Sequence, residues 1–137
     1  MADQYGLFID GKWISTSDTV TNRHPSDVND VVGEYAQANA GQVDMALEAA
    51  NRAVAEWGVS AMEARYQVLM AIGTELIERS GALGELLARE EGKTRAEGVG
   101  EVYRSGQFFH CFAAEVHRQI DARAEPVRRG GGSETRR

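Results

Sequence analysis

The sequence is poor in cysteine and lacks a long hydrophobic run. Its single cysteine, Cys111, excludes an intrachain disulfide and any zinc site built from several cysteines. No apolar run approaches the roughly 20 residues that a membrane-spanning helix needs. The amino terminus also lacks the basic stretch and apolar core of a secretory signal. These absences predict a cytoplasmic protein that does not enter a membrane.

Basic residues are scarce in most of the chain. The formal net charge is -6 at pH 7, although residues 121–137 carry five arginines against three acidic residues. An acidic body repels phosphate groups, which argues against a nucleic-acid partner. A length of 137 residues allows one compact core and is too short for two domains that bind a dinucleotide and a substrate between them.

The first 36 residues are typical of a small antiparallel ribbon. Hydrophobic side chains alternate over residues 5–9, Asp10-Gly11 suits a tight two-residue turn, and residues 12–14 return as a second strand. After the polar connection 15–22, a His-Pro-Ser-Asp turn leads to another short strand at 31–36. The sequence therefore predicts a hairpin and one further strand.

From residue 43 onward the hydrophobic residues recur at helical spacing, which predicts four amphipathic helices joined by short connections. Asn39 and Gln42 form a capping pair for the first helix, which ends at Trp57. Ser60 and Glu63 fit the capping box that opens a second helix. The fold class is therefore α+β.

Capping residues also mark the third and fourth helices. Ser80 is expected to cap the third, and Gly92 supplies the left-handed residue that ends it. Thr94 and Glu97 form a second capping box, and the fourth helix is expected to end near Arg118. Beyond that point the apolar period is lost and three consecutive glycines appear, so residues 119–137 are predicted to be a disordered tail.

Residues that carry chemistry are few and scattered. Cys111 is expected to be a buried structural thiol, because the adjacent His110 points about 100° away around the helix. His110 and His117 with Glu115 nearby suggest a metal site, but no third ligand has the right spacing, and none is expected. No catalytic triad is found among the residues.

Glycines and charges allow two further interpretations. Gly98-x-Gly100 lies inside a helical pattern with no preceding strand, so a dinucleotide-binding turn is rejected in favour of close helix packing or a substrate near the backbone. The charged run 89–93 is a candidate general acid and base pair. A solvated helix end is the simpler interpretation of the same residues.

Several motifs follow one another in a familiar order: residues 8–13 (FIDGKW), 25–27 (PSD), 32–34 (VGE), 46–57 and 90–94 (EEGKT). Together they resemble the amino-terminal pattern of the NAD(P)-dependent aldehyde dehydrogenase superfamily. Residues 97–102 and 106–109 are similar to the branch that oxidises 2-oxoglutarate semialdehyde and related ω-semialdehyde acids. The resemblance covers about residues 5 to 118.

The resemblance implies a scaffold role. In the family this region supplies a hairpin that joins the oligomerisation sheet, and helices that flank the nucleotide-binding domain. The catalytic cysteine, the general-base glutamate and the cofactor-contacting residues come later, and Cys111 does not match the nucleophile motif. The resemblance therefore implies that these residues contain no catalytic, metal or cofactor-binding residue, with NAD or NADP as the cofactor of the parent family.

The helix at residues 101–112 resembles the one that lines the substrate tunnel of the family. Gly100, Arg104 and Phe108 are the positions that the resemblance places toward the tunnel. An arginine there is suited to pair with the carboxylate of an acidic aldehyde. A surface charge is the alternative interpretation of Arg104.

The domain organisation expected from these patterns is an aldehyde dehydrogenase segment at 1–118 and an Arg/Gly-rich tail at 119–137, whose composition is typical of a GC-rich gene read out of frame. The expected protein is a truncated aldehyde dehydrogenase that is inactive alone. The alternative is a small helical interaction module that docks on a full-length relative or another protein through its hairpin edge and apolar helix faces.

Overall fold

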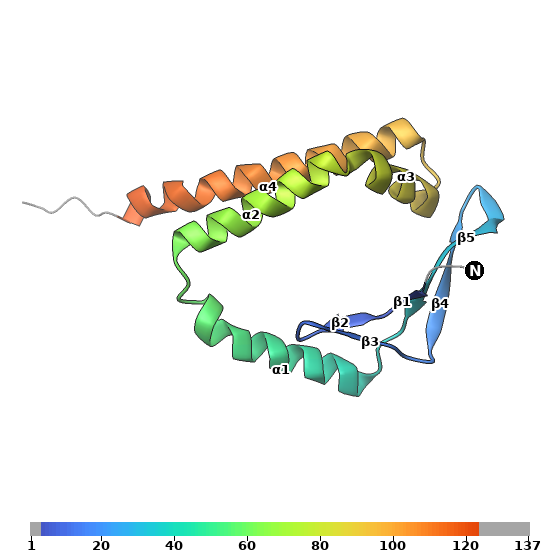
Figure 1. Cartoon of the computed structure of the whole chain (residues 1–137), viewed down its shortest axis with the longest axis horizontal. Coiled ribbons are helices and arrows are strands. Elements are labelled where there is room, and N and C mark those ends of the chain that lie inside the picture. The colour runs from blue at the N-terminus through green and yellow to red at the C-terminus, as the bar shows by residue number, and fades with distance from the viewer. Residues whose placement is uncertain (1–3, 124–137) are drawn as a thin grey trace, which may run out of the picture.

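The computed structural model describes the backbone of residues 4–123 and the side chains of residues 4–116 and 118. The architecture is the expected α+β arrangement, in which the longest strands lie near one end of a pair of long helices and the amino-terminal hairpin lies beside another helix (Figure 1). In chain order the elements are β1 (Gln4–Tyr5), β2 (Leu7–Ile9), β3 (Lys12–Ile14), β4 (Thr19–His24), β5 (Asp27–Ala36), α1 (Ala40–Trp57), α2 (Met62–Glu78), α3 (Ser80–Glu91) and α4 (Arg95–Arg123).

The predicted hairpin is confirmed. Strands β2 and β3 pair antiparallel, and the turn residues Asp10 and Gly11 have φ values of 52° and 75°. Glycine adopts this left-handed backbone without steric cost, and aspartate tolerates it better than most residues. Ile9 is buried on one face of the hairpin. Phe8 and Trp13 lie 61% and 70% exposed, with their ring centroids 5.0 Å apart.

The second sheet differs from the predicted antiparallel ribbon in two ways. Its strand order is β1-β5-β4, and β1 pairs with β5 in the parallel direction. Residues 19–24, which fall partly in the predicted polar connection, form the strand β4. Thr19 and Thr21 donate hydrogen bonds to the Glu34 carboxylate across the sheet, at 3.4 and 2.9 Å. Polar cross-strand pairs stabilise this strand without the hydrophobic alternation that identifies a strand in a sequence.

Two of the four predicted caps are confirmed and two are wrong. Asn39 with Gln42 forms a capping box at α1, and Thr94 with Glu97 forms one at α4. Ser60 makes no cap, because its hydroxyl donates to the carbonyl of Trp57 instead. Ser80 is the first residue of α3 rather than its cap. The preceding residue has φ -94° and ψ 9°, so α3 follows α2 without the extended residue that a side-chain cap requires.

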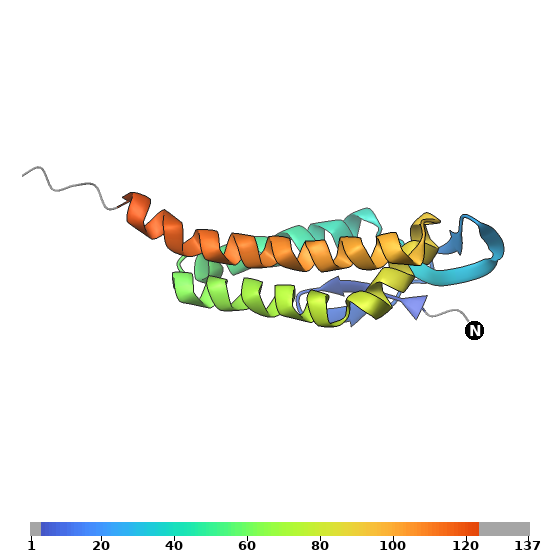
Figure 2. The same cartoon turned by 90° about the horizontal axis from the view of Figure 1, so that it is seen from above.

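Helices α2 and α4 lie side by side and antiparallel (Figure 1, Figure 2). Glycines permit their close approach: a Cβ atom on Gly106 would lie 2.7 Å from the Gly73 carbonyl oxygen. A Cβ on Gly98 would lie only 2.2 Å from the carbonyl oxygen of Gly84 in α3. The expectation of close helix packing is therefore confirmed for Gly98, and Gly106 makes a second contact of this kind. The third helix ends at Gly92 with φ 72°, as predicted.

The helix α1 lies beside the hairpin and apart from the α2–α4 pair (Figure 1). None of its residues is buried. Helix α4 continues to Arg123, five residues beyond the predicted end, and the remainder of the predicted tail, residues 124–137, lies outside the described residues. Among the helices that the structure describes, none has the length and apolar character to cross a membrane.

Candidate functional site

The three predicted tunnel residues share one face of α4. Gly100, Arg104 and Phe108 follow one another at intervals of four residues, so their side chains lie on one side of the helix. All three are exposed, Phe108 to 58%. A shallow depression of about 300 Å³ is lined by Gly100 and Arg104 together with Glu97 and Glu101. The geometry brings these residues together, and their role toward a substrate stays a prediction.

The two carboxylates beside Arg104 are already engaged. Glu101 accepts a hydrogen bond from Lys93 Nζ at 2.7 Å, and this contact, with a second one to Glu91, raises the pKa of Lys93. Glu97 accepts from the Thr94 hydroxyl and backbone N–H, which lowers the pKa of its carboxyl. Arg104 itself has no hydrogen-bond or ion-pair partner among the described residues, so its guanidinium is available to an acidic ligand.

The prediction of a buried thiol at Cys111 is wrong. The side chain is exposed, since Cys111 lies seven residues after Arg104 and therefore on the same outer face of α4. The inner face of this helix carries Val102, Gly106 and Ala113 instead. Cys111 makes no hydrogen bond to a base in the described part of the chain, so it lacks the arrangement of an activated nucleophile.

The two-histidine arrangement gains no support. His110 Nε2 lies 3.2 Å from the Thr74 hydroxyl of α2, which gives its ring a structural partner. The side chain of His117 lies outside the described residues. Within the described residues no group of three His, Cys, Asp or Glu side chains could hold a metal ion.

The charged run at residues 89–93 joins the helices to the sheet. Arg89 donates from Nη2 and Nε to both carboxylate oxygens of Asp30 in β5, at 2.7 and 3.0 Å. This bidentate hydrogen bond lowers the pKa of Asp30 and raises that of Arg89. Next to it, Glu90 Oε1 accepts from the Tyr35 hydroxyl at 3.0 Å and from Asn22 Nδ2 at 3.1 Å. Burial and the Glu90 carboxylate together raise the pKa of Tyr35.

These contacts show that Arg89 and Glu90 are not the solvated helix end considered from the sequence, whereas the acid and base pair stays a prediction. We define Arg89, Glu90, Asp30, Tyr35 and Asn22 as the α3–sheet clamp. Its sheet partners were missed because Asp30 and Tyr35 lie 59 and 55 residues from their partners along the chain. No spacing rule for helices or strands connects residues so far apart.

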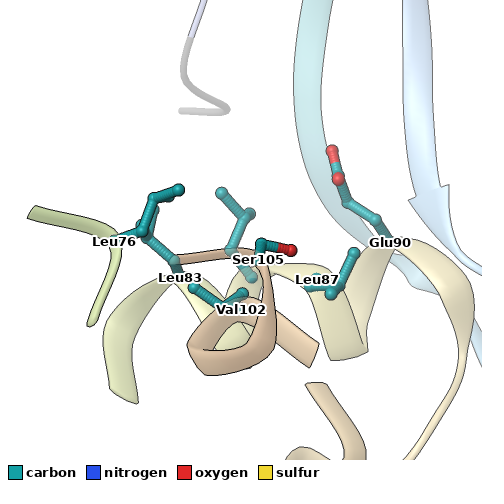
Figure 3. A pocket seen from close by; sticks show the side chains of 7 residues that line it. Leu76, Leu83, Leu87, Glu90, Val102 and Ser105 are labelled. Carbon is teal, nitrogen blue, oxygen red and sulfur yellow. The ribbon is translucent and has the colours of Figure 1, made fainter. Parts of the chain in front are cut away.

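An apolar pocket of about 260 Å³ lies between α2, α3 and α4 (Figure 3). It is lined by Leu76, Leu83, Leu86, Leu87 and Val102, with Glu90 and Ser105 as its polar members. Figure 3 shows the Glu90 carboxylate directed toward the strands and away from the leucines. The pocket therefore offers apolar contact and no pair of groups suited to acid–base or nucleophilic chemistry.

The glycines of α4 do not form a phosphate-binding turn. A phosphate-binding turn needs glycines between a strand and a helix amino terminus, where backbone N–H groups are free. Gly98 and Gly100 instead lie within α4, and Gly98 packs on Gly84 of α3. No step of a redox reaction can be assigned to the part of the chain that the structure describes.

Comparison with known proteins identifies the family. The sequence model of the aldehyde dehydrogenase family matches residues 13–137, so the chain belongs to the aldehyde dehydrogenase family. It is 33% identical over 118 residues to the alpha-ketoglutarate semialdehyde dehydrogenase of Haloferax volcanii, a match that covers 85% of this chain and 24% of the relative. These matches confirm the resemblance seen in the motifs.

Solved structures agree with this assignment. A 1-pyrroline-5-carboxylate dehydrogenase variant of Thermus thermophilus superposes with a TM-score of 0.87 at 28% identity, over 95% of this chain and 25% of that one. An NAD-dependent aldehyde dehydrogenase of Sinorhizobium meliloti shares the fold, with a TM-score of 0.79 at 23% identity, over 84% of this chain and 24% of that one. The chain thus spans about a quarter of the length of its relatives. The family match includes residues 119–137, and the origin of that segment stays a prediction.

Proposed function

We propose that these residues form the amino-terminal scaffold of an NAD(P)-dependent aldehyde dehydrogenase that oxidises an acidic semialdehyde to a carboxylate. The observation that carries the proposal is the family match over residues 13–137, combined with a fold that places Arg104 unpaired on an exposed helix face. The names of two similar proteins, an alpha-ketoglutarate semialdehyde dehydrogenase and an NAD-dependent aldehyde dehydrogenase, support the substrate class and the cofactor.

A polypeptide of these 137 residues alone is proposed to be inactive. Aldehyde oxidation through a thiol requires a nucleophile, a base that activates it and a bound hydride acceptor. The exposed Cys111 has no base at hydrogen-bond distance among the described residues, and no dinucleotide cradle is formed there. The contribution of the segment is therefore to position α4 and to support the domains that carry the chemistry.

Arg104 is proposed to select the acidic substrate. Its planar guanidinium can donate two parallel hydrogen bonds to a carboxylate, which a neutral aldehyde lacks. Gly100 on the same face leaves open space beside it, because a Cβ at this position would meet no atom within 4 Å. Phe108 supplies an apolar surface one turn further along.

The test is an Arg104→Ala substitution in an intact homologue that carries arginine at this position. The KM for an acidic aldehyde should rise roughly tenfold, the loss expected for one charge-assisted contact, while the KM for a neutral aldehyde stays the same. The matched control is Arg95→Ala, which removes an exposed arginine of the same helix that is paired with Glu85. An equal effect of Arg104→Ala on both aldehydes would exclude the assignment.

A second function is supported by the exposed aromatic pair of the hairpin. Phe8 and Trp13 form an apolar surface next to open strand edges, which suits docking on another protein. The two functions differ in what the isolated chain does: the scaffold requires the rest of an enzyme, whereas an interaction module is a stable species or forms a defined complex.

A further inference from the structure

The corner between α1 and α2 is held by few contacts. Only residues 58–61 connect the two helices, and none of the residues of α1 is buried. At the hairpin, α1 is joined by an ion pair between Arg52 and Asp10 at 3.2 Å, in which both side chains are largely exposed. Exposed ion pairs of this kind contribute little to stability. Met45 of α1 lines a pocket with Ile9 and Ile14 of the hairpin, so the corner shares with this contact the task of orienting α1 relative to α2.

One side chain of α2 reaches across this corner. The Arg65 Nη2 atom donates to the carbonyl oxygens of Trp57 and Gly58, at 2.8 and 2.9 Å. Its Nε donates to the Ser60 hydroxyl at 3.1 Å, and that hydroxyl donates to the Trp57 carbonyl at 2.8 Å. The guanidinium also lies 5.7 Å from the centre of the Trp57 ring.

The acceptors that Arg65 uses lie at the carboxyl end of α1, where the Trp57 carbonyl also accepts from the Ser60 backbone N–H at 3.2 Å. The last carbonyls of a helix have no partner within the helix, and the helix dipole makes that end negative. The last turn of α1 contains no basic residue of its own. The Arg65 guanidinium of the next helix therefore supplies the positive charge at the carboxyl end of α1 and connects that end to the first turns of α2.

We propose that Arg65 acts as a corner strap that fixes the angle between α1 and α2. A guanidinium is suited to this role because its donors lie in one rigid plane and reach several acceptors at once. A lysine ammonium keeps the charge but cannot span the carbonyls and the Ser60 hydroxyl in the same fixed geometry. By fixing this angle, Arg65 also fixes the direction in which the exposed apolar side chains of α1 point.

The experiment measures the distance between α1 and α4 in the full chain by pulsed dipolar spectroscopy, with the labelled chain diluted in unlabelled chain so that association adds no distances between labels. One spin label is attached to the exposed Cys111 and the other to an Asp44→Cys substitution near the start of α1. The distance distribution should be narrow in the parent and roughly twice as wide or more in Arg65→Ala, while Arg65→Lys is intermediate. Circular dichroism checks that the helix content is unchanged.

Arg79→Ala is the matched control. Arg79 flanks the other end of α2 and forms one exposed ion pair with Glu75. Its removal should leave the distribution as narrow as in the parent. A broad distribution in the parent, an unchanged one in Arg65→Ala, or equal broadening by Arg79→Ala would overturn the proposal. If Arg65→Ala loses helix content, the proposal is tested by comparing Arg65→Lys with the parent. Distance distributions of equal width in these two proteins would overturn the proposal.

Discussion

Asp30 and Arg89 form the most directional contact between the sheet and the helices. Both carboxylate oxygens of Asp30 accept from the same guanidinium, a fork-to-fork geometry that a lysine could not reproduce. The hydrogen bonds favour the ionised carboxylate and lower its pKa. Because the folded-state pKa is depressed, this contact stabilises the fold above the unfolded value of about 4, and the contribution is lost as the pH falls through the folded pKa.

Asp30→Asn should therefore lower the midpoint of thermal unfolding at about pH 7, and the difference from the parent should shrink below about pH 4. Thermal unfolding followed by circular dichroism over this pH range measures the effect. Asp44→Asn, on the exposed surface of α1, is the control and should change little. If the unfolding midpoints of Asp30→Asn and the parent differed by the same amount in acid, the loss of stability would come from the shape of the amide and not from the lost charge.

The two Ser/Thr-x-x-Glu motifs show how well local sequence predicts a helix cap. Thr94 and Ser60 both precede a glutamate by three residues, yet only Thr94 makes the reciprocal cap. The Ser60 hydroxyl is occupied by the Trp57 carbonyl and by Arg65. That competition arises from the corner between two helices, which the four residues of the motif do not encode. The candidate residues of α4 could be placed on one face from their spacing, whereas the partners in the α3–sheet clamp could not.

At the scale of elements, α4 shows two kinds of glycine within three residues. Gly98 lies against the backbone of α3, whereas Gly100 faces open space on the outer surface. Both look alike in the sequence, and only the packing of α3 on α4 separates them. The helical period was sufficient to locate all four helices, because each one has a stripe of apolar residues. It could not locate β4, whose stabilising side chains are polar.

Alanine substitutions at these two positions should have opposite effects. Gly98→Ala should lower the free energy of unfolding by about 1–3 kcal/mol, since its Cβ would overlap the Gly84 carbonyl and force the helices apart. Gly100→Ala should raise it by about 0.5–1 kcal/mol, because alanine restricts the unfolded chain and favours the helix. Urea unfolding of the two variants provides the comparison. A change of the same sign in both would contradict the packing of α4 on α3.

At the scale of the whole molecule, apolar surface is unusually exposed. The exposed large hydrophobic side chains include Phe8, Trp13, Val43, Leu47, Val54, Trp57, Phe108 and Phe112. Among the described residues, only Ile9, Val32, Ala88, Val102 and Ala113 are buried hydrophobic side chains. Because the chain spans about a quarter of its relatives, we expect this surface to be covered by other parts of a longer protein.

The isolated chain is therefore expected to unfold over a broad temperature range and to associate with increasing concentration. Sedimentation velocity over a concentration series measures the association, and calorimetry measures the cooperativity. A Phe8→Ser and Trp13→Ser double variant should weaken the association, whereas Val59→Ser, at an exposed position between α1 and α2, should not. A compact monomer with one sharp transition would instead favour the interaction module.

Helix α4 packs on its neighbours from Gly98 to Ala113. Gly98 lies against α3 and Gly106 against α2, His110 contacts Thr74 of α2, and Ala113 is fully buried. The carboxyl-terminal turns project beyond the start of α2 (Figure 1, Figure 2). Arg104 and Phe108 lie on the outer face of this packed stretch, so a bend of the projecting turns should move them little. The residues proposed to face a substrate are therefore expected to keep their positions when the end of the helix moves.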